Sequence, residues 1–389
     1  MTKKLYDQDA YQIEFHAVVE QCTSVKKKDY TKYKVVLDQT LFFPEEGGQS
    51  PDQGYIDNKE VIDVQIKDNI IIHTLKEPLV VGSKVHGVIA WEHRFNNMQQ
   101  HSGEHIFSGL VHQQYGYDNV GFHLSNQIVT MDFNGVLTPI QAAEIERKAN
   151  EVIIRNLPIE VTFPLKKELA TLEYRSKIEI EGQVRIVTIP GVDVCACCAP
   201  HVHYTREIGL LKIMSLQNYK GGVRISILCG YRALEDYREK VKVIAELSVA
   251  LSSNQENLVG AVNRIKEETQ SLKQELYATK QAFLETKISQ IPKSKEDVLL
   301  FENNLDTLTM RNGVNRLVSE HTGVCGIFSG LDREGYKFIL ASKEKDIRQV
   351  MAILKEVLDA RGGGSAAMVQ GSVSARKEDI IAAIHDGMA

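Results

Sequence analysis

The stretch MQQHSGEHIFSGL, residues 98–110, decides how we interpret this sequence of 389 residues. It lies in a segment from Trp91 to about Tyr115 whose apolar residues recur at helical spacing. Side chains four residues apart lie on the same face of a helix, so we predict that His101 and His105 lie side by side. Alone, this pair is a weak indication of a metal site, because two histidines at this spacing also occur by chance.

A second pair of suitable ligands follows in DVCACCAPHVHYT, residues 193–205. Cys197 and His201 are again four apart, in a predicted loop of small residues and proline. Thiolate and imidazole are preferred ligands of zinc, and the two pairs together complete a tetrahedral set. We therefore predict one Zn²⁺ per chain, held by His101, His105, Cys197 and His201.

The other cysteines nearby leave an alternative open. Cys195 and Cys198 lie close enough in sequence to replace Cys197 as the sulfur ligand, although a small buried apolar role explains Cys195 more simply. Six cysteines in a chain of this length do not indicate a disulfide framework. The N-terminus lacks the apolar core of a signal peptide, and no apolar run is long enough to span a membrane. We expect a cytoplasmic protein with no membrane partner.

The remaining sequence predicts an α+β protein of four segments. Residues 1–90 alternate like strands and predict a small β-barrel or strongly bent sheet, interrupted by the loop LFFPEEGGQSPDQG. Residues 91–230 mix helices and strands and predict an α+β domain that carries the zinc ligands.

The second half of the chain has a different composition. Residues 231–292 predict a long helix or helical hairpin with an imperfect coiled-coil seam, since Ile244, Leu251 and Leu258 begin a seven-residue spacing. Such a seam is typical of internal packing or of a homodimer. Residues 293–389 predict a small α/β domain in which a helix over 346–360 ends at a run of glycines, 362–364.

Several motifs recur in the order known from one family. They are LDQTLFFPEEGGQSPDQG (37–54), QQHSGEHIFSGL (99–110), VRIVTIPGVDVCACCAPHVHYTREIGLLKI (184–213), KGGVRISILCG (220–230) and GGGSAAMVQGS (362–372). The first four resemble the editing domain of alanyl-tRNA synthetase, most of all its free-standing AlaX-type relatives. The seven-residue spacing and the last motif resemble the synthetase's C-terminal, DHHA1-type domain.

The resemblance implies a function and a set of roles. The implied activity is hydrolysis of mischarged Ser-tRNA(Ala), and in some members of Gly-tRNA(Ala), with the four predicted ligands on the family's zinc positions. Thr40 and Gln49 correspond to residues beside the reacting ester. Gly47 and Gly48, together with the glycines Gly362, Gly363 and Gly364, would contact the tRNA substrate.

Each of these roles has a simpler alternative. Gly47 and Gly48 also fit a plain tight turn, Gln49 a solvated loop amide, and Thr40 a strand end. The sequence contains no segment for an ATP-binding aminoacylation core, so we expect no synthetase activity.

Two functional alternatives also stay open. HSGEH fits the H-x-x-E-H pattern of inverted zinc peptidases, in which Glu104 would be the general base and Glu179 or Glu181 a ligand. Glu104 would otherwise be a residue around the metal site or on the helix surface. The other alternative is a non-catalytic tRNA-binding zinc protein.

Overall fold

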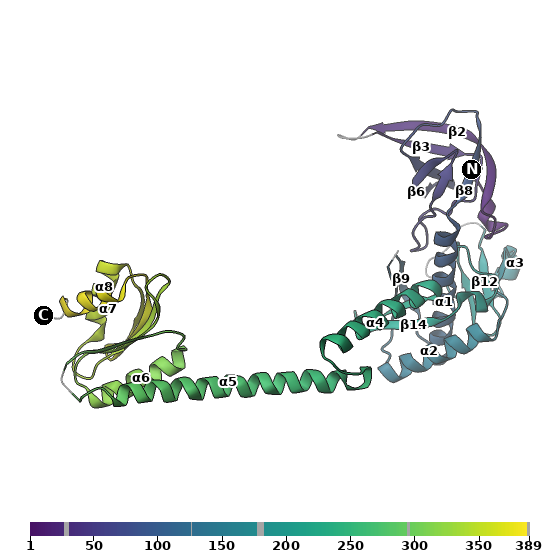
Figure 1. Ribbon diagram of the computed structural model, residues 1–389. Coiled ribbons are helices and arrows are strands. Elements are labelled where there is room, and N and C mark those ends of the chain that lie inside the picture. Colours follow the sequence, from purple (N-terminus) through teal and green to yellow (C-terminus); the bar gives the residue numbers. More distant parts are fainter. Residues whose placement is uncertain (27–30, 126, 177–182, 294–295, 387–389) are drawn as a thin grey trace. The chain divides into compact units, whose positions relative to one another are not determined.

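The computed structural model describes residues 1–26, 31–125, 127–176, 183–293 and 296–386. They form two compact units, residues 1–244 and 245–389, and each is described by itself (Figure 1). Helices and several sheets alternate along the chain, which agrees with the predicted α+β class. Within the described ranges, no helix is both long and apolar enough to cross a membrane.

The first unit begins with the predicted barrel. Six antiparallel strands close in the order β2-β3-β7-β6-β5-β8. The strands are β2 (Glu14–Lys26), β3 (Thr31–Leu37), β5 (Gly54–Ile56), β6 (Lys59–Lys67), β7 (Ile70–Leu75) and β8 (Lys84–Ile89). Burial alternates along β7, where His73 and Leu75 are buried. Asp68 and Asn69 have positive φ angles of 51° and 59°, as a two-residue β-hairpin turn requires.

Short elements connect this barrel to its surroundings. A parallel pair joins β1 (Lys3–Lys4) to β4 (Gln39–Thr40), and a 3₁₀ turn, η1 (Leu5–Asp7), follows β1. The loop over 41–53 leaves β4 and returns at β5, and its first residues, Leu41 to Phe43, are buried in the barrel core. The glycine-rich part of this loop is thus held at its start by apolar packing.

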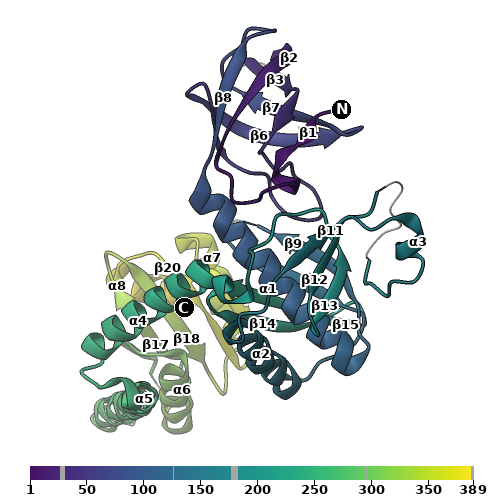
Figure 2. The same ribbon diagram turned by 90° about the vertical axis from the view of Figure 1, so that its right-hand side faces the viewer.

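The rest of the first unit is the predicted α+β domain. Two helices, α1 (Trp91–Tyr115) and α2 (Pro139–Ile154), share one apolar core with two sheets, and Figure 2 shows α1 running from the barrel into this domain. One sheet has the order β14 (Leu211–Tyr219), β15 (Gly222–Cys229), β10 (Val129–Phe133), β9 (Asn119–Leu124). The other has the order β11 (Glu160–Thr162), β12 (Ile186–Ile189), β13 (Asp193–Ala196). Two short helices, α3 (Lys166–Leu169) and η2 (Thr205–Ile208), complete the domain.

Helix α1 buries an unusual number of polar side chains. Its buried polar residues are Arg94, Asn97, Gln99, Gln100, His101, Ser102, Glu104, His105 and Ser108. Buried polar groups destabilise a fold unless they are hydrogen-bonded, so this helix needs partners for them in addition to the apolar core that it shares. Gly109 brings α1 close to β13, because a Cβ there would lie 2.4 Å from the Val192 carbonyl oxygen.

The segment that was predicted as a long helix or a helical hairpin consists of two helices. Helix α4 (Gly230–Ala250) ends before Ser252, whose φ is +47°, and α5 (Leu258–Ser289) starts after the 3₁₀ turn η3 (Gln255–Asn257). The seam residues Ile265 and Leu272 on α5 are 50% and 57% exposed. Self-association through this stripe therefore stays a prediction.

The second unit ends in a five-stranded sheet between two helix layers. The sheet has the order β16 (Val298–Glu302), β17 (Cys325–Leu331), β18 (Gly335–Ala341), β20 (Met368–Val373), β19 (Arg361–Gly364). The end of α5 and α6 (Thr307–Glu320) share one apolar cluster with the sheet, and α7 (Ile347–Leu358) and α8 (Lys377–Asp386) share another. Only the β16–β17 pair is parallel, so the expected α/β domain is a layered, mainly antiparallel one.

The glycine run near the C-terminus corrects one expectation. Helix α7 ends at Leu358, where Asp359 adopts a left-handed conformation with φ +50°. Gly362, Gly363 and Gly364 do not cap this helix but form β19, an exposed edge strand paired with β20. A Cβ on Gly362 would lie 2.3 Å from the Gln370 carbonyl oxygen, so close strand pairing explains this glycine.

Candidate metal centre

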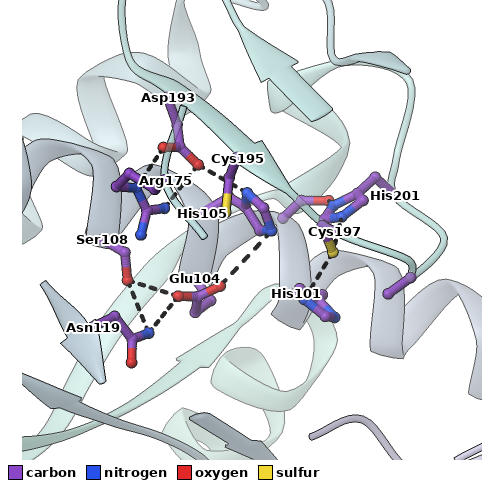
Figure 3. Close-up of polar contacts among 12 residues, drawn as sticks. His101, Glu104, His105, Ser108, Asn119, Arg175, Asp193, Cys195, Cys197 and His201 are labelled. Carbon is purple, nitrogen blue, oxygen red and sulfur yellow. Dashed lines mark hydrogen bonds and ion pairs between the residues drawn. The ribbon is translucent and has the colours of Figure 1, made fainter. Parts of the chain in front are cut away.

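The four predicted ligands converge at one point in the first unit. His101, His105, Cys197 and His201 each offer a ligand atom, and all four atoms lie within 4.8 Å of one another. The three histidines are buried and Cys197 is half-buried. Figure 3 shows the two histidines of α1 facing the pair that follows β13. The structure thus joins two pairs that are far apart in the sequence.

Arg185 holds the segment that carries Cys197. The Cys197 backbone N–H donates to the Arg185 carbonyl oxygen at 3.1 Å. The guanidinium Nη1 of Arg185 donates in return to the carbonyl oxygens of Cys197 and Ala199, at 2.8 and 2.9 Å. Its Nε lies 3.3 Å from Asp7 of η1. The loop is therefore fixed from both the sheet and the barrel side.

Each histidine is held through its Nδ1 atom by a different partner. His101 Nδ1 lies 2.7 Å from Gln49 Oε1, and His105 Nδ1 lies 2.8 Å from Asp193 Oδ2. His201 Nδ1 lies 3.0 Å from Ser102 Oγ. These contacts leave the Nε2 atoms facing the centre. Ligating histidines in metalloproteins are commonly oriented in this way by an outer partner on the other nitrogen.

The local charges favour a thiolate among the imidazoles. Burial opposes ionisation of Cys197, but His101 and His201 outweigh it and hold the pKa of this thiol well below its ordinary value. Cys197 Sγ lies 3.5 Å from His101 Nε2 and 3.4 Å from His201 Nε2. Burial lowers the pKa of His201 to about 3, so this ring is a neutral donor at physiological pH. A thiolate and neutral imidazoles are the forms that bind metal.

Asp193 completes the surroundings of His105. Burial disfavours charge on both groups, yet their hydrogen bond prevails and holds the pKa of His105 well above its ordinary value. The pKa of Asp193 is lowered despite its burial, because His105 and Arg175 donate to it. A metal at Nε2 of His105 would take the place of the second proton, while Asp193 keeps the proton on Nδ1.

The donor set fits zinc, and geometry favours Cys197 as the sulfur. Three imidazoles and one thiolate are usual zinc ligands. Cys195 belongs to a second group with His105 and Asp193, but burial raises the pKa of its thiol to about 11. Burial also holds the pKa of Cys198 well above its ordinary value. All six cysteines are free thiols.

Glu104 is buried and is not a helix-surface residue. Its Oε1 accepts from Ser108 Oγ and Asn119 Nδ2, both at 2.6 Å, and its Oε2 lies 3.9 Å from His105 Nε2. The peptidase alternative also needs Glu179 or Glu181 as a ligand, and both lie outside the described residues. Cys197 and His201 already face the two helix histidines, so a metal bound there needs no glutamate ligand. This arrangement does not favour the peptidase alternative.

The glycine-rich loop reaches the centre directly. Gly47 and Gly48 have positive φ angles of 61° and 82°. A Cβ on Gly48 would lie 2.4 Å from the Phe122 carbonyl oxygen, and the Gly48 carbonyl accepts from the Leu124 N–H at 2.7 Å. Gly48 thus allows the loop to approach β9 closely, and Gly47 fits its left-handed conformation beside Cys198. Gln49, which follows them, is fully buried beside His101 and is no solvated loop amide.

Buried polar atoms without a partner gather in and near this loop. Among the described residues, they include Glu46 Oε2, Gln49 Nε2, Ser50 Oγ and Tyr6 Oη. Burying such atoms unpaired costs about 1–3 kcal/mol each, so their persistence indicates that water or a ligand supplies the missing hydrogen bonds.

Thr40 lies inside the barrel with a partner that the sequence did not indicate. Its Oγ1 lies 2.9 Å from His73 Nε2 and accepts from the Phe42 N–H at 3.1 Å. His73 Nδ1 lies 3.3 Å from the Val35 carbonyl oxygen, which can only accept, so Nδ1 carries the proton. The neutral ring therefore accepts at Nε2, and Thr40 donates its hydroxyl proton to it. Toward a ligand, Thr40 can then only accept.

We predict a specific acid sensitivity from His73. Burial lowers the pKa of His73 from 6.5 to about 4, so between these pH values only the unfolded chain binds this proton. Stability is therefore full above pH 6.5 and falls as the pH is lowered toward 4, by about 2–3 kcal/mol. In the His73→Gln variant, whose Oε1 can still accept from Thr40, this part of the pH dependence should vanish.

Urea unfolding between pH 4.5 and 7 measures this difference. Trp91, the one tryptophan, starts α1 and so reports on the first unit. Subtracting the variant's profile from that of the unmodified protein cancels acid effects on the metal ligands. If the free energies of unfolding of the two proteins change in parallel with pH, the proton positions assigned to His73 and Thr40 are wrong.

A hollow lies next to the candidate metal centre, on the side of Asp193 and Cys195. It has a volume of about 740 Å³ and is lined by Asn119, Arg175, Asp193 and Cys195, among others. Two of its lining residues, Asp193 and Cys195, lie close to His105. The glycine-rich loop approaches the other helix histidine, His101. His105 is thus contacted by Asp193, as Figure 3 shows, and His101 by Gln49 of the loop.

Family comparisons match two parts of the first unit. Residues 2–93 match the model described as tRNA synthetases class II (A). Residues 184–226 match the threonyl and alanyl tRNA synthetase second additional domain. The second match contains Cys197 and His201, and the first contains Thr40 and the glycine-rich loop.

Related proteins match nearly the full chain. The alanyl-tRNA editing protein AlaX-L of Pyrococcus horikoshii is 28% identical over 403 residues, covering 98% of this chain and 96% of that protein. The alanyl-tRNA editing protein Aarsd1 of Danio rerio is 27% identical, covering 94% and 92%. An alanine–tRNA ligase of Ignicoccus hospitalis is 32% identical over 70% of this chain, which spans 31% of that ligase. These matches confirm the resemblance inferred from the motifs.

Proposed function

We propose that this chain, a member of the alanyl-tRNA editing protein family, is a zinc-dependent deacylase that hydrolyses mischarged Ser-tRNA(Ala). We propose Gly-tRNA(Ala) as a second substrate and the cytoplasm as its place of action. The observation that carries the proposal is the contact between Gln49 and His101, because it makes the glycine-rich loop and the four-ligand centre a single site.

Hydrolysis of an aminoacyl ester requires few catalytic groups. The ester between an amino acid and the terminal ribose is already activated, so the enzyme needs mainly to position water and stabilise the developing oxyanion. Gly47 and Gly48 lack side chains, which allows the carbonyl of the ester to approach the loop backbone. Zinc, when bound to the four ligands, supplies positive charge beside the ester.

Gln49 and Thr40 take complementary roles in this proposal. Gln49 orients His101 through Oε1, and its unpaired Nε2–H is free to donate to the substrate carbonyl or ribose. Thr40 accepts from the hydroxyl of the misattached serine, because its own proton is committed to His73. Alanine has no hydroxyl and leaves this acceptor unpaired, which disfavours the correctly charged tRNA.

The second unit is assigned a supporting role. We propose that α5 associates with a second chain through its exposed apolar stripe. We propose that the C-terminal sheet, including the exposed glycines 362–364, holds the body of the tRNA. Both assignments rest on the family resemblance and on the exposure of these residues. Neither part of the chain takes part in the ester chemistry.

A deacylation assay tests the function. We expect the zinc-loaded protein to release serine from Ser-tRNA(Ala) at least on the order of a hundredfold faster than alanine from Ala-tRNA(Ala). A chelator should abolish release, and added zinc should restore it. Gly-tRNA(Ala) in the same assay defines the second substrate. The non-catalytic alternative would be correct if fully zinc-loaded protein binds tRNA(Ala) but leaves Ser-tRNA(Ala) intact.

A further inference from the structure

A second hollow lies beside the glycine-rich loop, at the start of α1 and α4. It has a volume of about 450 Å³ and is lined by Glu92, His93, Asn96, Tyr231, Arg232 and Glu235. All of these residues belong to the first unit. His93 Nε2 lies 3.1 Å from the carbonyl oxygen of Pro51, which is the second residue after Gln49. The hollow therefore borders the loop that reaches the metal centre.

Arg232 is a partly buried cation bonded to neutral groups. Its Nη1 donates to the Ser125 carbonyl oxygen at 2.6 Å, and its Nη2 donates to Asn97 Oδ1 at 2.9 Å. In the described part of the chain, no carboxylate forms an ion pair with it. Burial accordingly lowers the pKa of this guanidinium. A guanidinium held in this way keeps unused donors and unneutralised charge for an anion.

The contacts of Arg232 place it next to the proposed reaction site. Ser125 directly follows Leu124, whose N–H donates to the Gly48 carbonyl oxygen at 2.7 Å. Asn97 lies four residues before His101 on α1, a rise of about 6 Å along the helix. Arg232 is thus tied both to the strand that supports the glycine-rich loop and to the helix that carries the metal ligands.

We propose that this hollow binds the single-stranded 3′ end of tRNA, with Arg232 holding a phosphodiester just upstream of the ester. The inference rests on the proposed function and names how its substrate is held. Arginine suits this role because its planar fork can donate two hydrogen bonds to a phosphate.

The other lining residues agree with a nucleotide. Tyr231 is 64% exposed and offers a ring on which an unpaired base can stack. Asn96 Oδ1 is a buried acceptor without a partner in the described residues. The carboxylates of Glu92 and Glu235 lie on the exposed rim, and Glu235 is paired with Arg238 at 3.1 Å. Water screens these exposed charges more than it screens Arg232.

Two minimal substrates separate the phosphate contact from the ester chemistry. One is 3′-O-seryl-adenosine, which has no phosphodiester, and the other is the seryl-CCA trinucleotide. For the zinc-loaded full chain, Arg232→Gln should raise KM for the trinucleotide about tenfold. KM and kcat for the nucleoside should stay within about twofold. Arg232→Lys, which keeps the charge but not the fork, should lie between the two. Lys242→Gln removes an exposed charge from the same helix, α4, and should change neither substrate.

Binding of uncharged acceptor-stem RNA provides a second measurement that needs no turnover. Arg232→Gln should reduce the slope of log Kd against log salt by about one, and Lys242→Gln should not. If no ester is hydrolysed but the slope falls, the deacylase assignment is wrong and the phosphate subsite stands. If hydrolysis proceeds and Arg232→Gln affects nucleoside and trinucleotide equally, or neither, the subsite is wrong. Loss of bound zinc in both Arg232 variants would likewise assign Arg232 to folding.

Discussion

Cys197→Ala will lose its metal, while Cys195→Ala and Cys198→Ala will keep it. Removing outer partners of ligating histidines weakens metal binding roughly 10–100-fold in other proteins, so removal of a ligand should exceed about a hundredfold. Of the three thiols, Cys197 has a pKa that is lowered overall, because its neighbouring imidazoles outweigh burial, whereas burial outweighs His105 and raises the pKa of Cys195 to about 11. Zinc content after dialysis against a competing chelator, and serine release from Ser-tRNA(Ala), measure the effect.

The same three variants distinguish the functional alternatives. A peptidase built on the H-x-x-E-H pattern would keep its metal without Cys197, because its ligands are two histidines and a glutamate. A zinc-retaining Cys197→Ala protein would therefore contradict the four-ligand centre. Loss of zinc in Cys198→Ala instead would move the sulfur ligand by one residue. A further variant tests that outcome. A Cβ on Gly47 would lie 3.3 Å from Cys198 Sγ. If Cys198 were the ligand, Gly47→Ala should therefore also impair metal binding.

The convergence of His101, His105, Cys197 and His201 was predictable because these residues come in two local pairs. His101 and His105 share a helix face by spacing alone, and Cys197 and His201 have side chains that few functions other than metal binding require together. The partners on the Nδ1 atoms were not predictable. Gln49, Ser102 and Asp193 are common residues whose contacts arise only when the barrel loop, α1 and β13 pack together. The sequence around Asp193 contains one usable signal, an acid within an otherwise apolar strand beside the cysteines.

The errors in fold prediction concern short strands that pair with a strand close by in the sequence. The glycines at 362–364 were interpreted as a helix end, because glycine is a strong local stop signal. They form β19 instead, which pairs with the next strand along the chain, β20, and glycine also fits a strand where two backbones approach closely. The strands β9 and β13 were missed because they are short and contain asparagine, glycine or aspartate, which are uncommon in strands, although each pairs with a strand that is its neighbour along the chain. Helix α4 ends shortly before Ser252, which has a positive φ angle. The heptad spacing continues across this position and therefore gives no sign of the interruption.

Arg94→Met should destabilise the first unit by about 3–5 kcal/mol, because it leaves Asp52 as an uncompensated buried charge. Both side chains are fully buried, and Arg94 Nε lies 3.0 Å from both carboxylate oxygens of Asp52. Arg94 also donates to the carbonyl oxygens of Ala10 and Leu41, and Asp52 accepts from the Phe43 N–H at 2.6 Å. Urea unfolding followed by Trp91 fluorescence measures the loss, since Trp91 lies in the same helix.

A matched pair on the protein surface provides the control. Arg224 and Asp132 form a similar two-oxygen contact, but their side chains are 36% and 18% exposed. Arg224→Met should therefore cost about 1 kcal/mol or less. Equal losses of unfolding free energy in the two variants would show that burial does not increase the cost of breaking the Arg94–Asp52 pair.

The double variant Arg94→Met/Asp52→Asn decides what the pair does. If the cost of Arg94→Met comes from the charge left behind, the double variant should be more stable than the sum of the single losses predicts. Zinc affinity is a separate quantity in the same proteins. Asp52 and Phe43 bracket the loop that carries Gln49, so loosening the loop should weaken the hold of Gln49 on His101. We expect stability to recover in part in the double variant while zinc affinity stays reduced, because neutral Met and Asn side chains remove the buried charge without restoring the loop's anchor. Recovery of both together would mean that the pair supports the fold and leaves the orientation of the metal ligands to other contacts.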